Sequence, residues 1–341
     1  MKYALEPMLF AFEQELSKEN LENYLMELLD LDYWWDNHKE DMFVQKNASD
    51  VLWGNGYYPM ADSLKPLMKR HNINFIQYGD VNKIIEKMLT KSLYIDQLYD
   101  AALCEMESQT LTHPLNVQSN RNRPSELHEE LMTLLWHVFM AHEVGGCDEE
   151  SFVVITKGIS DNVSIKYEYN KLDEHCGVKK LVGSSIVNCK GSLKEFWNDT
   201  TTPFMLWKTA ERKDDLDLGI RIAVLQKENK PDIISVSENY DFMLQNSFYE
   251  DYCNGHYNSK DKDIRSTIQA MTDAVTEQNM AQVHVIRTGM GGNDPQLKIN
   301  DYGAQRRNIT TSIKLAYWKK GRELKFANMR EHDFFDPTWE T

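Results

Sequence analysis

Two side chains that could act together on a phosphodiester lie in the segment 121–128, where Arg121 and His128 stand at the head of an apolar stretch. A guanidinium can hold the oxygens of a phosphodiester, and an imidazole can move the proton that its cleavage requires. This pair would need no metal ion. Asn122 follows Arg121 directly as a polar neighbour. The segment is the first candidate for chemistry in the chain.

The segment resembles the loose signature of the HEPN ribonuclease superfamily, an all-helical module in which an arginine is followed by a polar residue and later by a histidine. The resemblance covers at most the first 145 residues. It implies that Arg121 binds phosphate, Asn122 gives polar support and His128 does acid/base work, with two protomers facing each other in a dimer. Pro124 departs from this pattern, because a proline starts a helix and leaves Arg121 in the preceding loop. The alternative is that the arginines are solvated loop charges and His128 is a surface residue.

A second candidate is the glycine-rich loop that follows a β-like run, with Thr288, Gly289, Gly291 and Gly292. Residues without a Cβ let backbone N–H groups approach a phosphate closely. The loop resembles the second phosphate loop of macrodomains, and that resemblance implies nucleotide or ADP-ribose binding through Thr288–Gly292. It covers only the helix, strand and loop of this region. The other glycine-rich loop of that family has no counterpart here, and a plain tight loop is the alternative.

Two further spacings suggest a metal site, and we expect neither to hold one. His137 and His142 are five residues apart, so their side chains diverge by roughly 140° on a helix. Asp217 and the run 228–230 have the order of a nuclease triad in which two carboxylates hold a divalent ion. The run lies beside Pro231, at the end of an expected strand, whereas such a triad requires a core strand.

The charge balance limits the partners of this chain. With 38 basic and 53 acidic residues the formal charge is -15, which disfavours non-specific binding to duplex DNA or anionic lipid. The one local basic concentration comprises Lys319, Lys320 and Arg322 with the pair 306–307. These groups could contact a phosphate backbone, or they could be solvated charges of a turn.

Cysteine usage and hydropathy favour a cytosolic protein. The five cysteines are scattered without a C-x-x-C pair, which predicts reduced thiols and neither a zinc ribbon nor a redox motif. No apolar stretch approaches the ~20 residues that a membrane span needs. The N-terminus has no charged region leading into a long apolar run, so we expect no signal peptide.

The elements that carry these residues change character near Gly145 and Gly146. Apolar residues recur with helical spacing through the first 145 residues, including 82–106. From Ser151 onward the runs 152–155 and 163–167 suggest a hairpin, and helical spacing returns at about 240–252 and 262–278. Short β-like runs lie between them, at 183–189, 204–209, 218–226 and 233–237. The sequence predicts an α+β fold, with a helical domain at 1–146 and a mixed, hairpin-rich sheet with helices at 151–341. This mixture favours α+β over a doubly wound parallel sheet.

These features favour an acidic cytosolic binding or adaptor protein that works in a multi-protein assembly, of the kind found in bacterial antiviral defence. Its contact surfaces would be the aromatic-rich region 33–58, otherwise expected to be core, and the C-terminal hairpin. The alternatives are a HEPN-like, metal-independent endoribonuclease using Arg121, Asn122 and His128, and a nucleotide or ADP-ribose binder. We expect a protein partner, contact with RNA or DNA phosphates, a homodimer, no membrane and no cofactor.

Overall fold

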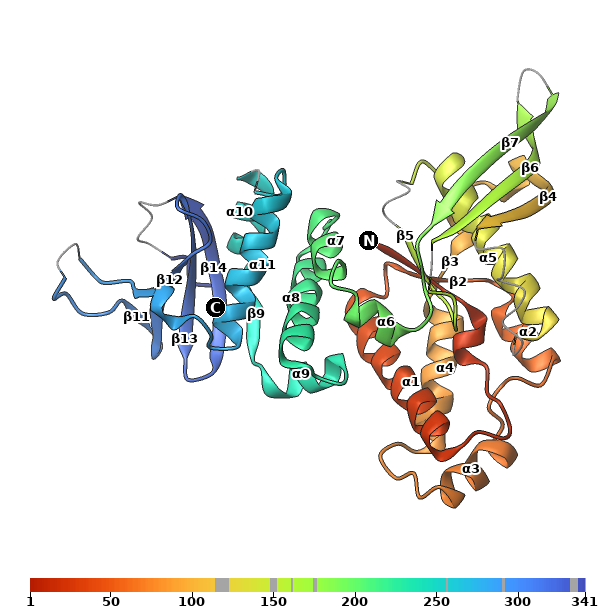
Figure 1. Ribbon diagram of the computed structural model, residues 1–341, viewed down its shortest axis with the longest axis horizontal. Helices are drawn as coiled ribbons and strands as arrows, with labels where there is room; N and C mark the ends of the chain where they lie inside the picture. Colours follow the sequence, from red (N-terminus) through yellow and green to blue (C-terminus); the bar gives the residue numbers. More distant parts are fainter. Residues whose placement is uncertain are drawn as a thin grey trace. The chain divides into compact units, whose positions relative to one another are not determined.

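The structure is a computed structural model that confirms the α+β class (Figure 1). It describes residues 1–113, 123–147, 152–160, 162–173, 177–255, 257–289, 292–331 and 337–340. The chain forms two compact units, Met1–Phe196 and Trp197–Thr341, each with its own sheet and helices. No helix in the described ranges is both long and apolar enough to span a membrane.

Unit 1 is built on a five-stranded sheet in which every neighbouring pair is parallel. The order is β3-β2-β1-β5-β8, so β1 is the central strand, with β2 and β3 on one side of it and β5 and β8 on the other. The strands are β1 (Lys2–Leu5), β2 (Met42–Val44), β3 (Leu93–Tyr94), β5 (Phe152–Ile155) and β8 (Cys189–Lys190). The helices are α1 (Lys18–His38), α2 (Ala48–Gly54), α3 (Ala61–Arg70), α4 (Tyr78–Lys91), α5 (Ser125–Glu143) and α6 (Leu193–Asn198).

This parallel sheet corrects two expectations. The first 146 residues are not purely helical, because they supply three of the five strands. The segment 152–155 does not form a hairpin with the segment that follows it, since β5 lies between β1 and β8. All four residues of β5 are buried, as is usual for a parallel strand covered on both faces, so period-2 alternation is missing from its sequence. The division into units accordingly falls at 196/197, whereas the sequence suggested one at 146/151.

A second, antiparallel sheet of unit 1 has the order β4-β6-β7 and packs one face on α5. Its strands are β4 (Cys104–His113), β6 (Val163–Asp173) and β7 (Gly177–Val187). Phe139 of α5 stacks on Tyr167 with ring centroids 4.4 Å apart. Gly183 is required here, because a Cβ at this position would come within 2.5 Å of the Phe139 ring. The expected helical pattern through 82–106 ends at Lys91, and η2 (Ile95–Leu98), η3 (Ala101–Leu103) and β4 follow.

Unit 2 packs helices on a sheet with the order β10-β12-β13-β14-β9, in which β11 also pairs with β12. Only the β14–β9 pair of this sheet is parallel among the described strands. The helices are α7 (Thr202–Lys208), α8 (Lys213–Glu228), α9 (Ile233–Asn239), α10 (Asn246–Asn254) and α11 (Asp261–Val275). The strands are β9 (Phe242–Leu244), β10 (Val283–Val285), β11 (Lys298–Ile299), β12 (Tyr302–Asn308), β13 (Ile313–Lys320) and β14 (Glu323–Glu331).

Helices replace three of the expected β-like runs of unit 2. The runs 204–209, 218–226 and 233–237 lie in α7, α8 and α9. α8 is apolar on most of its circumference because it is enclosed, and such a helix loses its amphipathic period. Gly219 of α8 abuts the ring of Trp207, where a Cβ would come within 2.5 Å of an indole carbon. The expected hairpin near the C-terminus is confirmed as β13 and β14, with Gly321 at a φ of 59° in the turn.

The aromatic-rich region 33–58 belongs to the core only in part, with Trp34, Phe43 and Tyr58 buried and Tyr33, Trp35 and Tyr57 half-buried. Trp34 is 1 % exposed and packs against Tyr3 and Phe196. Tyr58 is also buried, and it carries the stacked ring of Trp53, which is the exposed member of this set. The indole of Trp53 is therefore the part of the region that is open to a partner.

Candidate functional site

Arg123 lies beyond the carboxyl ends of β1 and β5, two neighbouring strands in the middle of the parallel sheet. Its guanidinium forms an ion pair with Glu6, which directly follows β1, and donates to the carbonyl of Lys157 after β5 at 2.8 Å. Glu6 also accepts the backbone N–H of Lys157 at 2.9 Å. Both side chains are almost fully buried, and burial lowers the pKa of Arg123 to about 10, so it stays charged at neutral pH. Arg123 therefore joins three segments of unit 1 and is not available to a ligand.

The proposed ribonuclease residues are placed only in part. Arg121 and Asn122 lie outside the described residues. His128 occupies the first turn of α5 and is half-buried, and its Nδ1 has no hydrogen-bond partner among the described residues. Burial lowers the pKa of His128, and the nearby charge of Arg123 acts in the same direction. The imidazole is consequently neutral at neutral pH, as a proton acceptor must be.

The described residues of the Thr288–Gly292 loop, Thr288, Gly289 and Gly292, are exposed in unit 2. Arg287 forms a bridge with Gln296, and the Thr288 N–H donates to the carbonyl of Pro295 at 3.0 Å. The described chain then continues into β11 and β12, so no helix directly follows the loop there. The carboxylate of Asp294 lies against Gly289, where a Cβ would meet its oxygen at 2.4 Å. A negative charge thus occupies the approach to this glycine, and Gly291 lies outside the described residues.

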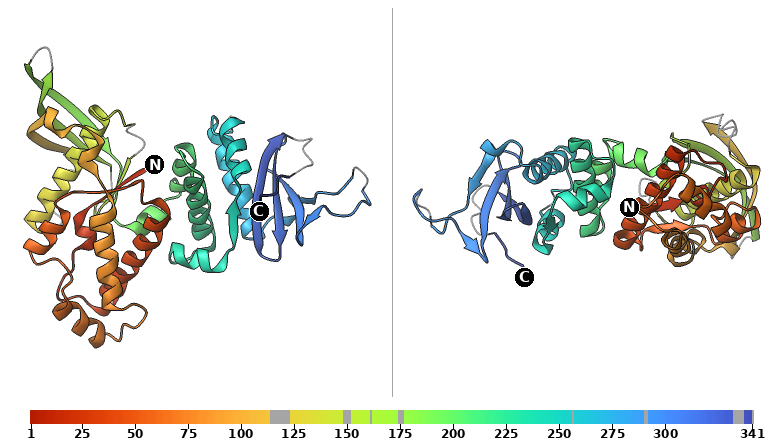
Figure 2. Two further views of the ribbon diagram at one scale, coloured as in Figure 1. Left: turned by 180° about the vertical axis from the view of Figure 1, so that it is seen from behind. Right: turned by 90° about the horizontal axis from the view of Figure 1, so that it is seen from below.

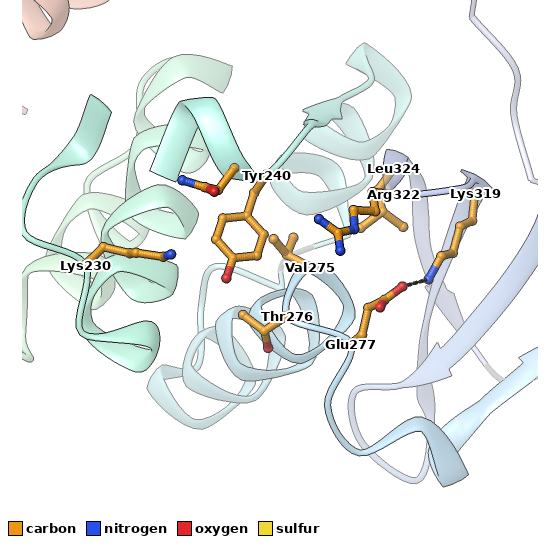
Figure 3. A pocket seen from close by; sticks show the side chains of 9 residues that line it. Lys230, Tyr240, Val275, Thr276, Glu277, Lys319, Arg322 and Leu324 are labelled. Carbon is orange, nitrogen blue, oxygen red and sulfur yellow. Dashed lines mark hydrogen bonds and ion pairs between the residues drawn. The ribbon is translucent and has the colours of Figure 1, made fainter. Parts of the chain in front are cut away.

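A polar cavity of about 190 Å³ lies within unit 2, where cationic side chains from separate elements converge (Figure 3). Lys230 follows the left-handed residue that ends α8, Lys319 lies near the end of β13, and Arg322 belongs to the β13–β14 turn. Tyr240, at the C-terminal end of α9, stands between Lys230 and Arg322 in Figure 3. The remaining lining residues are Asn239, Val275, Thr276, Glu277 and Leu324.

The charges in this cavity are unevenly paired. Lys319 binds Glu277 at 2.5 Å, and this contact lowers the pKa of Glu277. Glu277 is the one carboxylate among the nine lining residues, so Lys230 and Arg322 retain a net positive charge there. Lys230 lies 5.8 Å from the centre of the Tyr240 ring. Burial raises the pKa of Tyr240, and Glu228, which accepts a hydrogen bond from its hydroxyl, acts in the same direction.

The cavity brings together groups that the sequence had assigned to different chemistry. Lys319 and Arg322 belong to the basic concentration, whereas Lys230 belongs to the nuclease-triad pattern. The aspartate of that pattern, Asp217, does not line the cavity and is paired with Arg221 on α8. Arg307, also from the basic concentration, is buried and paired with Asp273. Tyr240 and Glu277 carried no signal, because no local pattern connects the end of α9 with the end of α11.

No protein-family model matches the chain, and searches of curated proteins and of solved structures gave no match either. Its function is accordingly argued from its own residues.

Proposed function

We propose that this chain is a binding protein whose C-terminal unit takes a phosphate-bearing ligand in the cavity between Lys230, Tyr240 and Arg322. The observation that carries the proposal is the convergence of three cationic side chains on one small cavity in a chain of formal charge -15. A binding role agrees with the expectation of an acidic binding or adaptor protein. Cationic side chains that gather at one place in an otherwise negatively charged chain indicate that this place binds an anion.

The cavity favours an anion even after the opposing effects are counted. α11 ends at Val275, and the negative end of its dipole disfavours an anion by about 0.3–1 kcal/mol. Hydrogen bonds from Lys230 and Arg322 to a charged oxygen contribute about 1.5–3 kcal/mol each. The two cations outweigh the helix end, so the oxygens of the ligand should lie on the side of Lys230 and Arg322.

The size of the cavity limits the part of the ligand that it can enclose. Pockets for whole drug-sized ligands hold about 300–1,000 Å³. A cavity of about 190 Å³ suits one phosphate or diphosphate group, with the rest of a nucleotide or nucleic acid outside. Arg322 can present two N–H donors to one phosphate, whereas Lys230 acts as a point charge.

Calorimetric titration with inorganic phosphate, pyrophosphate and mononucleotides tests this proposal. We expect binding that Arg322→Gln weakens by roughly 10- to 150-fold, the equivalent of one charge-assisted hydrogen bond. Lys320→Gln is the matched control, because it removes the same charge two positions away, from a half-exposed side chain that does not line the cavity. Equal weakening by both substitutions, or no binding of any of the three probes, would refute the proposal.

Metal-independent RNA cleavage by Arg121, Asn122 and His128 remains a second proposal. The observation that favours it is the neutral imidazole of His128, whose Nδ1 has no partner among the described residues. That nitrogen is buried, so the proton of a ribose hydroxyl would have to pass to Nε2, the other nitrogen of the neutral ring. Arg123 cannot supply the phosphate contact because Glu6 holds it, so this function would depend on Arg121.

A further inference from the structure

An aliphatic row is exposed along β7, the outer strand of the antiparallel sheet in unit 1. Val178, Val182 and Ile186 are 68, 59 and 62 % exposed. They lie on one face of the strand, four residues apart. The other face of this sheet packs on α5 through Phe139. Aliphatic side chains this exposed and this regularly spaced on a strand indicate a contact surface.

The same strand has an open edge. β7 pairs with β6 along its whole length, from Val163 opposite Val187 to Asp173 opposite Gly177. No strand in the described ranges pairs with its other side, and Figures 1 and 2 show the β6–β7 hairpin projecting from the rest of unit 1. A long, aliphatic edge strand readily adds another strand, and proteins usually block such edges with charges, prolines or bulges. Of these blocking features, β7 has charges, the two adjacent lysines Lys179 and Lys180. It has no proline, and its register with β6 is regular, without a bulge.

We infer that two copies of this chain pair antiparallel through their β7 edges, about a two-fold axis at Val182. In this register Val182 faces its own copy, Val178 faces Ile186, and Lys180 faces Ser184. The two sheets then form one six-stranded sheet, in which three aliphatic pairs alternate with two Lys180–Ser184 pairs on the exposed face. A closed two-fold contact uses the same patch on both copies, so it consumes both open edges and cannot extend into a fibre.

Charge and apolar pairing select this register over its neighbours. An axis at Lys180 would place two like charges directly opposite each other, which destabilises a strand pair. An axis at Leu181 would oppose Val182 to Lys180, and an axis at Gly183 would oppose Ile186 to Lys180. An axis at Ser184 would leave Val178 and Lys180 without a partner strand. Only the axis at Val182 pairs aliphatic residues with aliphatic residues over the whole exposed row.

The mass of the full chain in solution gives the first test. Light scattering should show the mass rising with concentration from 39.9 kDa toward twice that value. Val182→Lys places two lysines opposite each other and should hold the mass at that of the monomer, whereas Val182→Thr keeps a β-branched residue and should still dimerise. Both substitutions alter an exposed side chain, and circular dichroism checks that the fold is kept. A monomeric wild type at all concentrations, or a dimer that survives Val182→Lys, would overturn the inference.

Disulfide trapping tests the register separately. Under mild oxidation Val182→Cys should form a covalent dimer above the wild-type background, which accounts for the native cysteines. Ser184→Cys is the matched control, because this residue is equally open but would face Lys180 of the other copy. A covalent dimer of Ser184→Cys with none of Val182→Cys would overturn the proposed axis. The contact lies in unit 1, so phosphate binding in unit 2 should be unchanged in every variant.

Discussion

Arg123→Met removes the charge that Glu6 requires and should destabilise unit 1 strongly. The side chains of Glu6 and Arg123 are 0 and 3 % exposed, so water cannot replace the lost partner. Breaking one side of a buried ion pair costs about 3–5 kcal/mol, because the remaining charge stays buried without compensation. Glu6 would retain one backbone donor, the N–H of Lys157, so the loss should lie in the lower part of this range.

The double substitution separates the cost of an unpaired charge from the value of the pair. Glu6→Leu together with Arg123→Met leaves no buried charge, and apolar replacements of buried pairs are often close to neutral. We therefore expect the double variant to be more stable than Arg123→Met alone. In a unit of 196 residues, each kcal/mol lost shifts the melting temperature by about 2–4 °C. A loss of about 3–4 kcal/mol in Arg123→Met should accordingly lower it by roughly 6–16 °C.

Calorimetric melting of the full chain measures these differences, because it resolves transitions of separate units. The coupling energy from the double-mutant cycle is the decisive quantity. A loss below about 1 kcal/mol for Arg123→Met, which is typical of an exposed pair, would refute the reasoning. So would a double variant whose loss equals the sum of the two single losses.

Two further predictions concern histidines of unit 1. The Nδ1 of His137 lies 2.6 Å from the Tyr99 hydroxyl, and burial lowers the pKa of this histidine. As the pH falls, His137 therefore binds a proton in the unfolded chain before it does so in the folded chain. Stability should fall as the pH drops through the unfolded and then the folded pKa, and urea titrations should show a shallower fall for His137→Gln than for the exposed control His284→Gln. RNA cleavage in excess EDTA should disappear in Arg121→Ala and His128→Ala if the second proposed function holds, and wild-type protein without cleavage would exclude it.

Local signals in the sequence located the elements that depend on near neighbours. The hairpin of β13 and β14 was visible because alternating apolar residues flank a glycine turn, and α11 was visible from its one apolar face. α8 was misread because apolar residues surround most of it and leave only a narrow polar stripe, with Asp217 and Arg221, to mark the helical period. The parallel sheet was missed because β1 and β5 are short, buried and far apart in the sequence.

The residues of the candidate cavity also differ in whether the sequence alone could identify them. Lys319 and Arg322 stand close together in the sequence, so their charge could be noticed before the fold was known. Tyr240 and Glu277 reach the cavity only because α9 and α11 end beside the same turn. The role of Arg123 was likewise hidden, since its partner Glu6 lies 117 positions away.

The pairing of Lys2 with Phe152 also bears on how the chain is made. A ribosome releases the first strand and β2 long before β5, the other neighbour of β1, exists, and β8 emerges later still. Contacts between distant positions form slowly, because the intervening chain must first be ordered. During synthesis, Tyr3, Ala4 and Leu5 must therefore wait with their apolar surface uncovered. Ribosome-associated chaperones bind such surfaces, and stalled chains shorter than about 190 residues should accordingly be protease-sensitive over the whole of unit 1.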